Sequence, residues 1–565
     1  MAQYDRLDPS RYDAEARAIL ARLRGGATIS RRRLLQGTAA GAAIAAVGGR
    51  SLHAAAQATP AAATPTGEKG GSGTLVVSTS GDPLSFQPDY QADDNAFAIV
   101  CNVYNSLLSL DGDYNVIPEL AQSYEAAADG LSITFHLAPN AVWHDGTPVT
   151  SADVKYTLET IRNTPSATAA TLLGSLSTVD TPDPQTAVVN LETPSSSIIG
   201  FLAWYGVFIL PAHLYEGTDW STNPANQQPV GSGPFRFSSY SAGQSIELEA
   251  NLDYWGEGPY LDRLIFQIIP DGNTAYQALL NGEIDVQSSP LMPSAEIPNA
   301  QSNPDLKVAE KPFPSPYYLG YNTLRPTWSK AEVRKAVAMA IDRDQIVATA
   351  LGGYSTPATT YYPTAIAWAS NTEPDAATPP FDLAGAAAAL DVAGFPVNGD
   401  SRFALDLVVF TGSQQYIDVA TVVGQQLAAI DIDVNLVAVE IATYDELTES
   451  GEFDMALIGG FQGPDPGNLR ARIGEGGGVN LWGYVNPRIE ELLDQGEQQT
   501  VQDERRESYF EIQRILAQDV PIIPLANYVE YTPYGTNVSG VWFDNTDPAA
   551  AFQGLNRFTL ARRAE

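Results

Sequence analysis

Cysteine is nearly absent from this sequence, which holds Cys101 and no other among 565 residues. A single cysteine excludes an intramolecular disulfide, so the folded chain has to be stabilised by packing alone. Cys101 stands among Ile99, Val100 and Val103, a setting that favours a small buried side chain over a reactive nucleophile.

Histidine is scarce too, with four in the chain. No two of them have a spacing typical of metal ligands, such as HxxxH, so His136 and His144 are poor candidates for a metal site. We therefore expect neither a metal nor a cofactor. Asp111 and Asp113 flank Gly112, and two carboxylates without further ligands more often form a plain turn than a cation site.

Sequence patterns typical of catalysis are missing as well. The chain has no GxSxG elbow, no HExxH, no P-loop and no Cys/His pairing with usable chemistry. Carboxylate pairs carry little weight, because 66 residues are acidic. We predict no catalytic residues and a protein that is not an enzyme, with an exported hydrolase as the less favoured alternative. A surface adhesion protein would have internal repeats, and none is visible.

Positive charge is in short supply: 31 Lys and Arg face 66 acidic residues, for a formal net charge of −35. Such a surface repels polyphosphate, so nucleic acid is excluded as a partner. The acidity is compatible with a cationic ligand, but a saline habitat or solubility alone explains it better. A hydrophobic content of 44% and a charged content of 17% are those of a soluble globular protein.

Long apolar runs are lacking, and the N-terminal one is short and weak. The basic run SRRRLLQ, residues 30–36, precedes a mildly apolar stretch, residues 37–49, that is too short for a membrane span. Together they resemble a twin-arginine export signal over residues 1–58, with small residues for cleavage after Ala56 or Ala58. No cysteine follows for lipid attachment, and residues 59–73 form a flexible linker.

This signal predicts an exported protein, periplasmic or extracellular, which an uncleaved signal would tether to the membrane. The alternative is a cytoplasmic amphipathic arm over residues 4–23 in front of an uncleaved anchor, because apolar residues in that segment recur at helical spacing.

The most ordered pattern covers residues 231–286. Ile246, Leu248 and Ala250 alternate with polar residues at the period of a strand buried on one face. Residues 264–269 form a nearly continuous apolar strand, which Pro270, Asp271 and Gly272 end. A short helix capped by Asn273 or Thr274, a stop at Gly282 and a further strand at residues 284–286 follow. This order is typical of a strand, crossover helix and strand unit.

Several segments resemble a known family. GSGPF at 231–235, NLDYWGEGPYLDRLIFQIIPD at 251–271 and LLNGEIDV at 279–286 are similar to the family 5 extracellular solute-binding proteins, the peptide, nickel and oligosaccharide receptors of ABC importers. Residues 118–161, 317–353 and 480–524 extend the resemblance. It implies an α/β, two-lobed periplasmic-binding-protein-like fold with mixed sheets, a discontinuous first lobe and a small inserted α+β domain. The expected segments are lobe 1 at 74–109, 230–312 and 528–565, the insertion at 110–229, and lobe 2 at 313–527.

Two predicted strand ends are candidate walls of a binding cleft, because open α/β sheets meet their ligands at the carboxyl ends of strands. One is Ser80, and the other is the glycine-rich loop at residues 459–466. Aromatic rings nearby in the sequence can stack on a ligand, although a ring such as Trp204 packs in a core more often. The candidate ligand-binding residues are Ser80, Trp204, Phe461, Gln462, Gly463, Trp482 and Tyr484. Replacement of Trp482 by alanine is predicted to weaken binding without unfolding the protein.

Two departures from the family bear on the ligand. The resemblance implies that peptide receptors carry an aspartate for the peptide amine at the position of Gln462, and a neutral amide binds an ammonium more weakly. The resemblance also implies that dipeptide receptors carry an arginine in this lobe for the ligand carboxylate. Here no arginine lies between Arg402 and Arg470. The expected function is a monomeric receptor that captures a peptide-like or other polar solute and delivers it to ABC importer permease subunits. An oligosaccharide receptor is the alternative.

Overall fold

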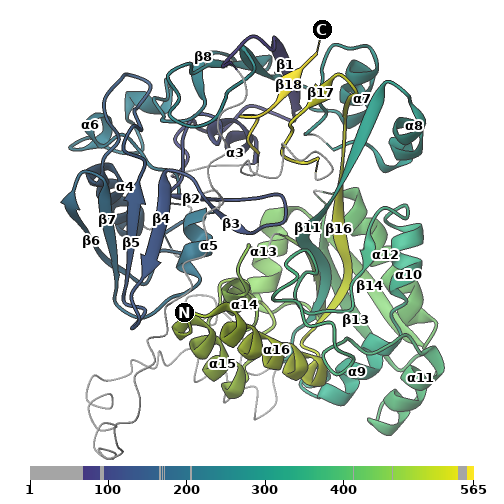
Figure 1. Ribbon diagram of the computed structural model, residues 1–565. Helices are drawn as coiled ribbons and strands as arrows, with labels where there is room; N and C mark the ends of the chain where they lie inside the picture. The colour runs from purple at the N-terminus through teal and green to yellow at the C-terminus, as the bar shows by residue number, and fades with distance from the viewer. Residues whose placement is uncertain are drawn as a thin grey trace, which may run out of the picture.

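The computed structural model describes residues 68–89, 94–164, 167, 169–170, 172–203, 207–289, 291–411, 413–460, 462–544 and 556–564. Two large lobes are joined by a pair of long strands, and a smaller sheet stands beside the first lobe (Figure 1). The predicted export signal, residues 1–58, and most of the predicted linker lie outside the described residues. In the segments that are described, the helices are too short or too polar to cross a membrane.

The first lobe is built on a four-stranded mixed sheet in the order β1-β10-β9-β8. β1 pairs with β10 in parallel, and the other two pairings are antiparallel. The predicted alternation is confirmed, because Ile246 and Leu248 of β9 are fully buried. Helix α7 follows β10, but Asp271 caps it rather than Asn273 or Thr274. The bounds are β1 Thr74–Thr79, β8 Phe235–Ser241, β9 Ser245–Ala250, β10 Arg263–Ile268 and α7 Gly272–Leu280.

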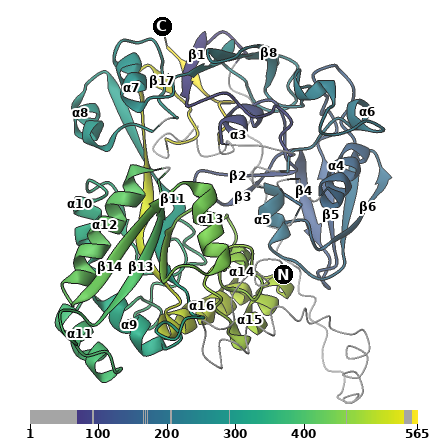
Figure 2. The ribbon, with the colours of Figure 1, turned by 180° about the vertical axis from the view of Figure 1, so that it is seen from behind.

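The smaller sheet is antiparallel, in the order β4-β5-β7-β6, and stands apart from the sheet of the second lobe (Figure 2). Helix α4 packs on it. Thr150 or Ser151 followed by Asp153 predicts a helix cap in the sequence, and the helix begins with a capping box between Thr150 and Asp153. The elements of this region are α3 Asp94–Val100, β2 Leu108–Leu110, β3 Val116–Pro118, β4 Ala121–Ala126, β5 Ser132–Leu137, α4 Ser151–Asn163, β6 Leu176–Asp183, β7 Thr186–Leu191, α5 Ile198–Ala203 and α6 Ala212–Tyr215.

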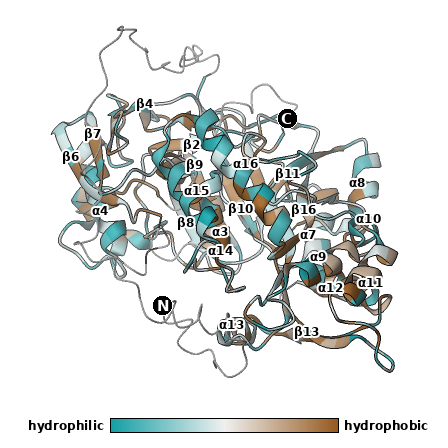
Figure 3. Cartoon of the chain, turned by 90° about the horizontal axis from the view of Figure 1, so that it is seen from below, coloured by the Kyte–Doolittle hydropathy of each residue, from teal (hydrophilic) through white to brown (hydrophobic). Residues whose placement is uncertain are grey.

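The second lobe has a six-stranded mixed sheet, β12-β16-β11-β15-β13-β14. Figure 3 shows β13 in hydrophobic colours, whereas α15 and α16 carry many hydrophilic residues. Its elements are β11 Leu306–Tyr321, α9 Ala331–Met339, α10 Arg343–Thr349, β12 Thr356–Pro357, α11 Leu383–Val392, β13 Phe403–Phe410, α12 Gln414–Ala428, β14 Ile432–Val439, α13 Ile441–Ser450, β15 Met455–Ile458, α14 Leu469–Ile473, α15 Pro487–Gln498, α16 Gln502–Asp519 and β16 Ile522–Gly535.

The lobes are connected by β11 and β16, which pair antiparallel from Leu306 opposite Gly535 to Gly320 opposite Ile522. The alternating prolines at 312, 314 and 316 favour an end of secondary structure, but β11 continues through them. Its pairing with β16 is interrupted between Pro312 and Pro316, since proline has no N–H to donate, and shifts register once more between Tyr317 and Tyr318. The link is therefore a two-stranded ribbon rather than a loop.

Cys101 is buried, as predicted, with 4% of its surface exposed. Desolvation raises the pKa of its thiol to about 12, and its Sγ donates to the carbonyl oxygen of Asn556 at 3.1 Å. Because the thiolate is the reactive form, we expect no reaction of the native protein with a thiol reagent at pH 8. One thiol per chain should react after denaturation in guanidinium, and rapid labelling of the native protein would contradict the burial.

Candidate functional site

Two of the predicted ligand-binding residues, Trp204 and Phe461, lie outside the described residues. The other five are described, and the structure gives them different environments. Trp482 and Tyr484 belong to the interior of the second lobe, whereas Ser80, Gln462 and Gly463 lie in loops that follow β1 and β15.

Trp482 is fully buried, with 0% of its surface exposed. Its ring lies flat against Gly320 of β11, where an added Cβ would stand 2.0 Å from a ring atom. The ring of Phe453 packs near it, with 6.3 Å between the centroids. The prediction that Trp482 stacks on a ligand is therefore wrong, because its faces are covered by the protein itself.

Tyr484 is likewise a structural residue, with 6% of its surface exposed. Its hydroxyl donates to Oδ2 of Asp519 at 2.6 Å, and the Asn486 amide donates to the same oxygen at 2.9 Å. Burial and the charge of Asp519 raise the pKa of the Tyr484 hydroxyl. These bonds fix the end of α16 to the segment before α15, which corrects the predicted ligand contact.

Ser80 follows β1 and is half-buried. Its hydroxyl and that of Thr79 each donate to Oδ1 of Asn95 at 2.9 Å. This pair of bonds ties the carboxyl end of β1 to the start of α3. Ser80 thus lies at a strand end, as predicted from the sequence, but its hydroxyl hydrogen is donated to the side chain of Asn95.

The loop after β15 combines a structural glycine with an unsatisfied amide. Gly463 has φ +73°, a conformation that favours glycine, and a Cβ there would stand 1.7 Å from the Asn468 amide. Gln462 is 3% exposed, and its backbone N–H donates to the carbonyl of Pro314 at 2.8 Å. Its side-chain Oε1 accepts no hydrogen bond from the residues that the structure describes. A buried acceptor without a donor is costly, so this oxygen is available to a ligand.

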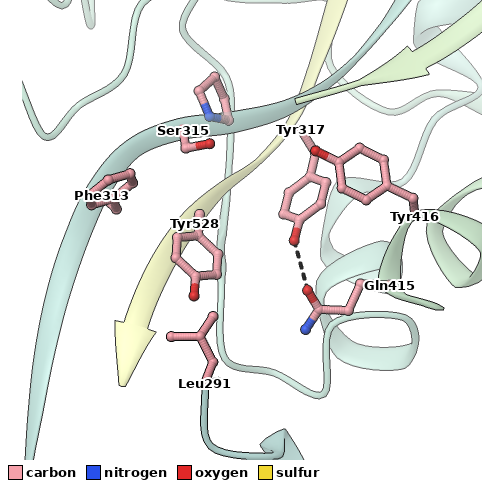
Figure 4. A pocket seen from close by; sticks show the side chains of 8 residues that line it. Leu291, Phe313, Ser315, Tyr317, Gln415, Tyr416 and Tyr528 are labelled. Carbon is pink, nitrogen blue, oxygen red and sulfur yellow. Dashed lines mark hydrogen bonds between the residues drawn. The ribbon is translucent and has the colours of Figure 1, made fainter. Parts of the chain in front are cut away.

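A pocket of about 260 Å³ lies where the lobes join. Leu291 comes from the first lobe, and the other walls come from β11, β16 and the start of α12 (Figure 4). Four of the eight lining residues are aromatic. The lining residues are Leu291, Phe313, Ser315, Pro316, Tyr317, Gln415, Tyr416 and Tyr528.

The aromatic side chains of the pocket support one another. The rings of Tyr317 and Tyr416 lie 5.2 Å apart, centroid to centroid, and those of Phe313 and Tyr528 lie 6.2 Å apart. The Tyr317 hydroxyl donates to Oε1 of Gln415 at 2.9 Å (Figure 4). That bond orients the Gln415 amide, whose Nε2 makes no hydrogen bond with any residue the structure describes.

Sequence reasoning missed these pocket residues although the signal was present. Gln415 and Tyr416 follow β13, which is parallel to β15, so both loops lie at the same edge of the sheet. The predicted loop borders the pocket, because a Cβ on Gly459 would stand 2.1 Å from the Tyr416 hydroxyl. The rule that pointed to residues 459–466 applies equally to the loop after β13.

A second contact between the lobes lies on the side of the inserted sheet. The hydroxyls of Ser195 and Ser197, just before α5, donate to Oε2 of Glu497 at 3.0 and 2.7 Å. The backbone N–H of Ser196 donates to the Glu497 carbonyl at 2.9 Å. The two lobes are thus joined through the ribbon and touch again at α15.

The histidine and acidic side chains give no sign of a metal centre in the described part of the chain, where no three potential ligands come together. His144 is engaged with the backbone: Nδ1 accepts from the N–H of Gly231 at 3.1 Å and Nε2 donates to the Gly233 carbonyl at 3.0 Å. Burial lowers its pKa to about 4, so the ring is neutral at pH 7.

Two lobes with mixed sheets, a paired-strand connection and an aromatic pocket between them define a solute-binding protein of the periplasmic type. Residues 115–480 match the family described as bacterial extracellular solute-binding proteins, family 5. The chain belongs to this family, as the resemblance predicted.

Relatives in the family differ in what their names say they bind. A Brucella ovis protein named as an ABC transporter peptide-binding protein is 30% identical over 80% of this chain and 86% of its own. Heme-binding protein A of Haemophilus influenzae is 27% identical over 83% of this chain and 89% of its own. The structure of the oligopeptide-binding protein AppA of Bacillus subtilis with a nonapeptide is 25% identical, has a TM-score of 0.71 and covers 88% of this chain and 100% of its own.

Proposed function

We propose that this protein is an exported receptor that binds a peptide in the pocket between its lobes and delivers it, chemically unchanged, to the permease subunits of an ABC importer. The observation that carries the proposal is the aromatic pocket at the lobe connection, lined from both lobes. A ligand that contacts both lobes shifts the hinge equilibrium toward the closed state, which is the form an importer can distinguish.

The family supports the export half of this proposal, since its description is extracellular. We propose that the run at residues 30–36 is a twin-arginine signal and that the mature protein acts as a monomer. Lobe 1 comprises residues 74–109, 230–312 and 528–565 with the insertion at 110–229, and lobe 2 comprises residues 313–527. The ribbon of β11 and β16 is the hinge between them.

The ligand class is tested by thermal shift with oligopeptides, oligosaccharides and cationic solutes, because a ligand that binds only the folded state raises its melting temperature. We expect peptides to stabilise the protein and to be recovered intact by mass spectrometry. Stabilisation by oligosaccharides alone would indicate a sugar ligand instead of a peptide. Recovery of cleaved peptides would indicate a hydrolase instead of a receptor.

The pocket itself is tested by replacing Tyr416 with alanine. Loss of one aromatic wall should weaken the binding of the best peptide about tenfold by calorimetry, since such contacts contribute about 0.5–1.5 kcal/mol beyond burial of the ring. Tyr124 provides the matched control, because this tyrosine lies on the inserted sheet and is 36% exposed. Unchanged affinity of the Tyr416→Ala protein would contradict the proposal that the peptide binds in this pocket.

A further inference from the structure

The pocket between the lobes is too small to enclose a whole peptide. Its volume is about 260 Å³, below the range of about 300–1,000 Å³ that is usual for sites enclosing a drug-sized ligand. An apolar cavity of about 150 Å³ is already large enough to hold benzene. The pocket therefore has room for one ring of a bound peptide, and the rest of the peptide lies outside it.

None of the eight described residues that line this pocket is charged at neutral pH. Burial raises the pKa of the hydroxyls of Tyr317, Tyr416 and Tyr528, so all three stay protonated. The nearest charged residues along the two strands, Lys311 and Glu530, stand opposite each other in the ribbon and attract each other. A charged side chain that entered the pocket would lose its water without gaining a counter-charge from the lining.

The rings of the pocket are arranged to receive another ring. Tyr317 and Tyr416 form one pair, tilted by 57°, and Phe313 and Tyr528 form a second pair, nearly perpendicular at 89°. Figure 4 shows the first pair on the right and the second on the left. Aromatic rings attract one another in such tilted and edge-to-face arrangements, with centroids about 4.5–7 Å apart. A ring that enters the pocket therefore meets aromatic surface from both pairs.

Leu291 brings the first lobe to the same pocket. It is 46% exposed, whereas the next residue, Met292, is 6% exposed in a hydrophobic cluster of that lobe. Because Met292 holds the segment in place, Leu291 stays at the pocket with nearly half of its surface uncovered. A bound ring would cover apolar surface of Leu291 and of the second lobe together, and burial of apolar surface is favourable.

Gln415 gives the pocket a directed hydrogen-bond donor. The Tyr317 hydroxyl donates to Oε1 of Gln415 at 2.9 Å, and no described residue accepts from its Nε2. Figure 4 shows that Nε2 points away from Tyr317. An N–H donor beside an aromatic ring complements the hydroxyl oxygen of a tyrosine side chain, and phenylalanine has no such oxygen.

We infer that the pocket is a subsite for one aromatic side chain of the bound peptide, and that Gln415 makes tyrosine the preferred residue. This inference rests on the proposed function. A charged residue is disfavoured because the lining offers no counter-charge, and a small residue is disfavoured because it leaves the apolar walls uncovered. The receptor thus selects peptides by a ring at one position.

The test measures the retention of synthetic nonapeptides on the protein by mass spectrometry. Four pools share a random background of glycine, alanine, serine and asparagine, and carry one tyrosine, one phenylalanine, one lysine or no further residue. A fifth pool is fully random. We expect the tyrosine and phenylalanine pools to be retained about tenfold or more above the lysine pool and the plain background, as burial of one aromatic side chain predicts. The tyrosine pool should exceed the phenylalanine pool about threefold to tenfold, the usual effect of one hydrogen bond.

Variants assign the tyrosine preference to Gln415. Q415M keeps the length of the side chain but removes the amide, so the preference for tyrosine over phenylalanine should fall below about twofold. Q415L is the second variant in case Q415M does not fold. Gln414, the neighbouring glutamine of α12, is the control, because it is exposed and donates to Asp418 at 2.9 Å. Q414M should keep the wild-type preference.

The outcomes separate the two proposals. Retention of the fully random pool together with equal retention of the tyrosine pool and the plain background overturns the aromatic subsite and leaves the peptide receptor standing. Equal retention of the tyrosine and phenylalanine pools by the wild type, or an intact tyrosine preference in both Gln415 variants, overturns the role of Gln415. Absence of retention of every pool overturns the peptide receptor and this inference with it.

Discussion

Replacing Trp482 with alanine should lower the free energy of unfolding by about 3–5 kcal/mol, the usual cost of removing a large buried aromatic side chain. The ring is fully buried against Gly320 and Phe453, so its loss leaves a cavity that the rigid β11 backbone cannot fill. The measurement is the midpoint of urea denaturation followed by circular dichroism. The change should be seen without any ligand, because the side chain serves the lobe and not the pocket.

A glycine pair provides the control for this prediction. Gly320→Ala places a methyl group 2.0 Å from the Trp482 ring and should destabilise the protein strongly as well. Gly424→Ala on α12 meets its nearest neighbour at 3.6 Å, an ordinary contact, and should be neutral or slightly stabilising. If the Trp482→Ala protein unfolded at the wild-type midpoint but lost its ligand, the stacking role expected from the sequence would be restored.

Replacing Asp465 with alanine should cost about 3–5 kcal/mol in the free energy of unfolding, because it leaves the Arg505 guanidinium buried without its counter-charge. The two oxygens of Asp465 accept from Nη1 and Nη2 of Arg505 at 2.8 and 2.7 Å. Each side chain is 8% exposed, so little water is available to replace the lost partner. The denaturation midpoint is again the measurement.

The position of this ion pair adds an effect on binding. Asp465 stands three residues after Gln462, and Arg505 ties this loop to α16 and to the Gly496 carbonyl at 2.9 Å. We therefore expect the Asp465→Ala protein to lose peptide affinity along with stability. Asp494→Ala is the control, since this exposed partner of Arg470 should change stability by no more than about 0.5 kcal/mol. The double variant Asp465→Leu, Arg505→Met should recover much of the loss, as no charge then stays unpaired.

Helices and strands that depend on residues close together in the chain were predictable. The period-two alternation around Ile246 predicted β9, and the serine, threonine and aspartate pattern near Thr150 predicted the capping box of α4. Caps with competing local candidates were less predictable: serine is a preferred capping residue, which favours Ser329, but the cap of α9 is Lys330. The adjacent basic residues Arg334 and Lys335 favour a solvated helix face. Arg334 is nevertheless 5% exposed, because its guanidinium donates to the carbonyls of Trp328, in the preceding loop, and of Asp519, far along the chain.

The site was predictable only in part. The loop at residues 459–466 was found from its place after a strand, and the Oε1 atom of Gln462 within it accepts no hydrogen bond from the described part of the chain. The aromatic walls were missed, because three segments far apart in the chain supply them and no local pattern marks the rings that face the pocket. The sequence does not distinguish Trp482, which is buried in the core, from Tyr416, which lines the pocket. The difference depends on the residues that each ring contacts in the fold.

The sequence alone determined what depends on neighbours in the chain: the strands and their turns, the lack of disulfides, and membership of a solute-binding family. The tertiary structure alone decided which aromatic rings line the pocket, which fill the core, and which buried arginines have a carboxylate beside them. The physical reason is that burial and charge pairing are set by contacts between distant segments, such as Gly320 with Trp482 or Gly460 with Arg472.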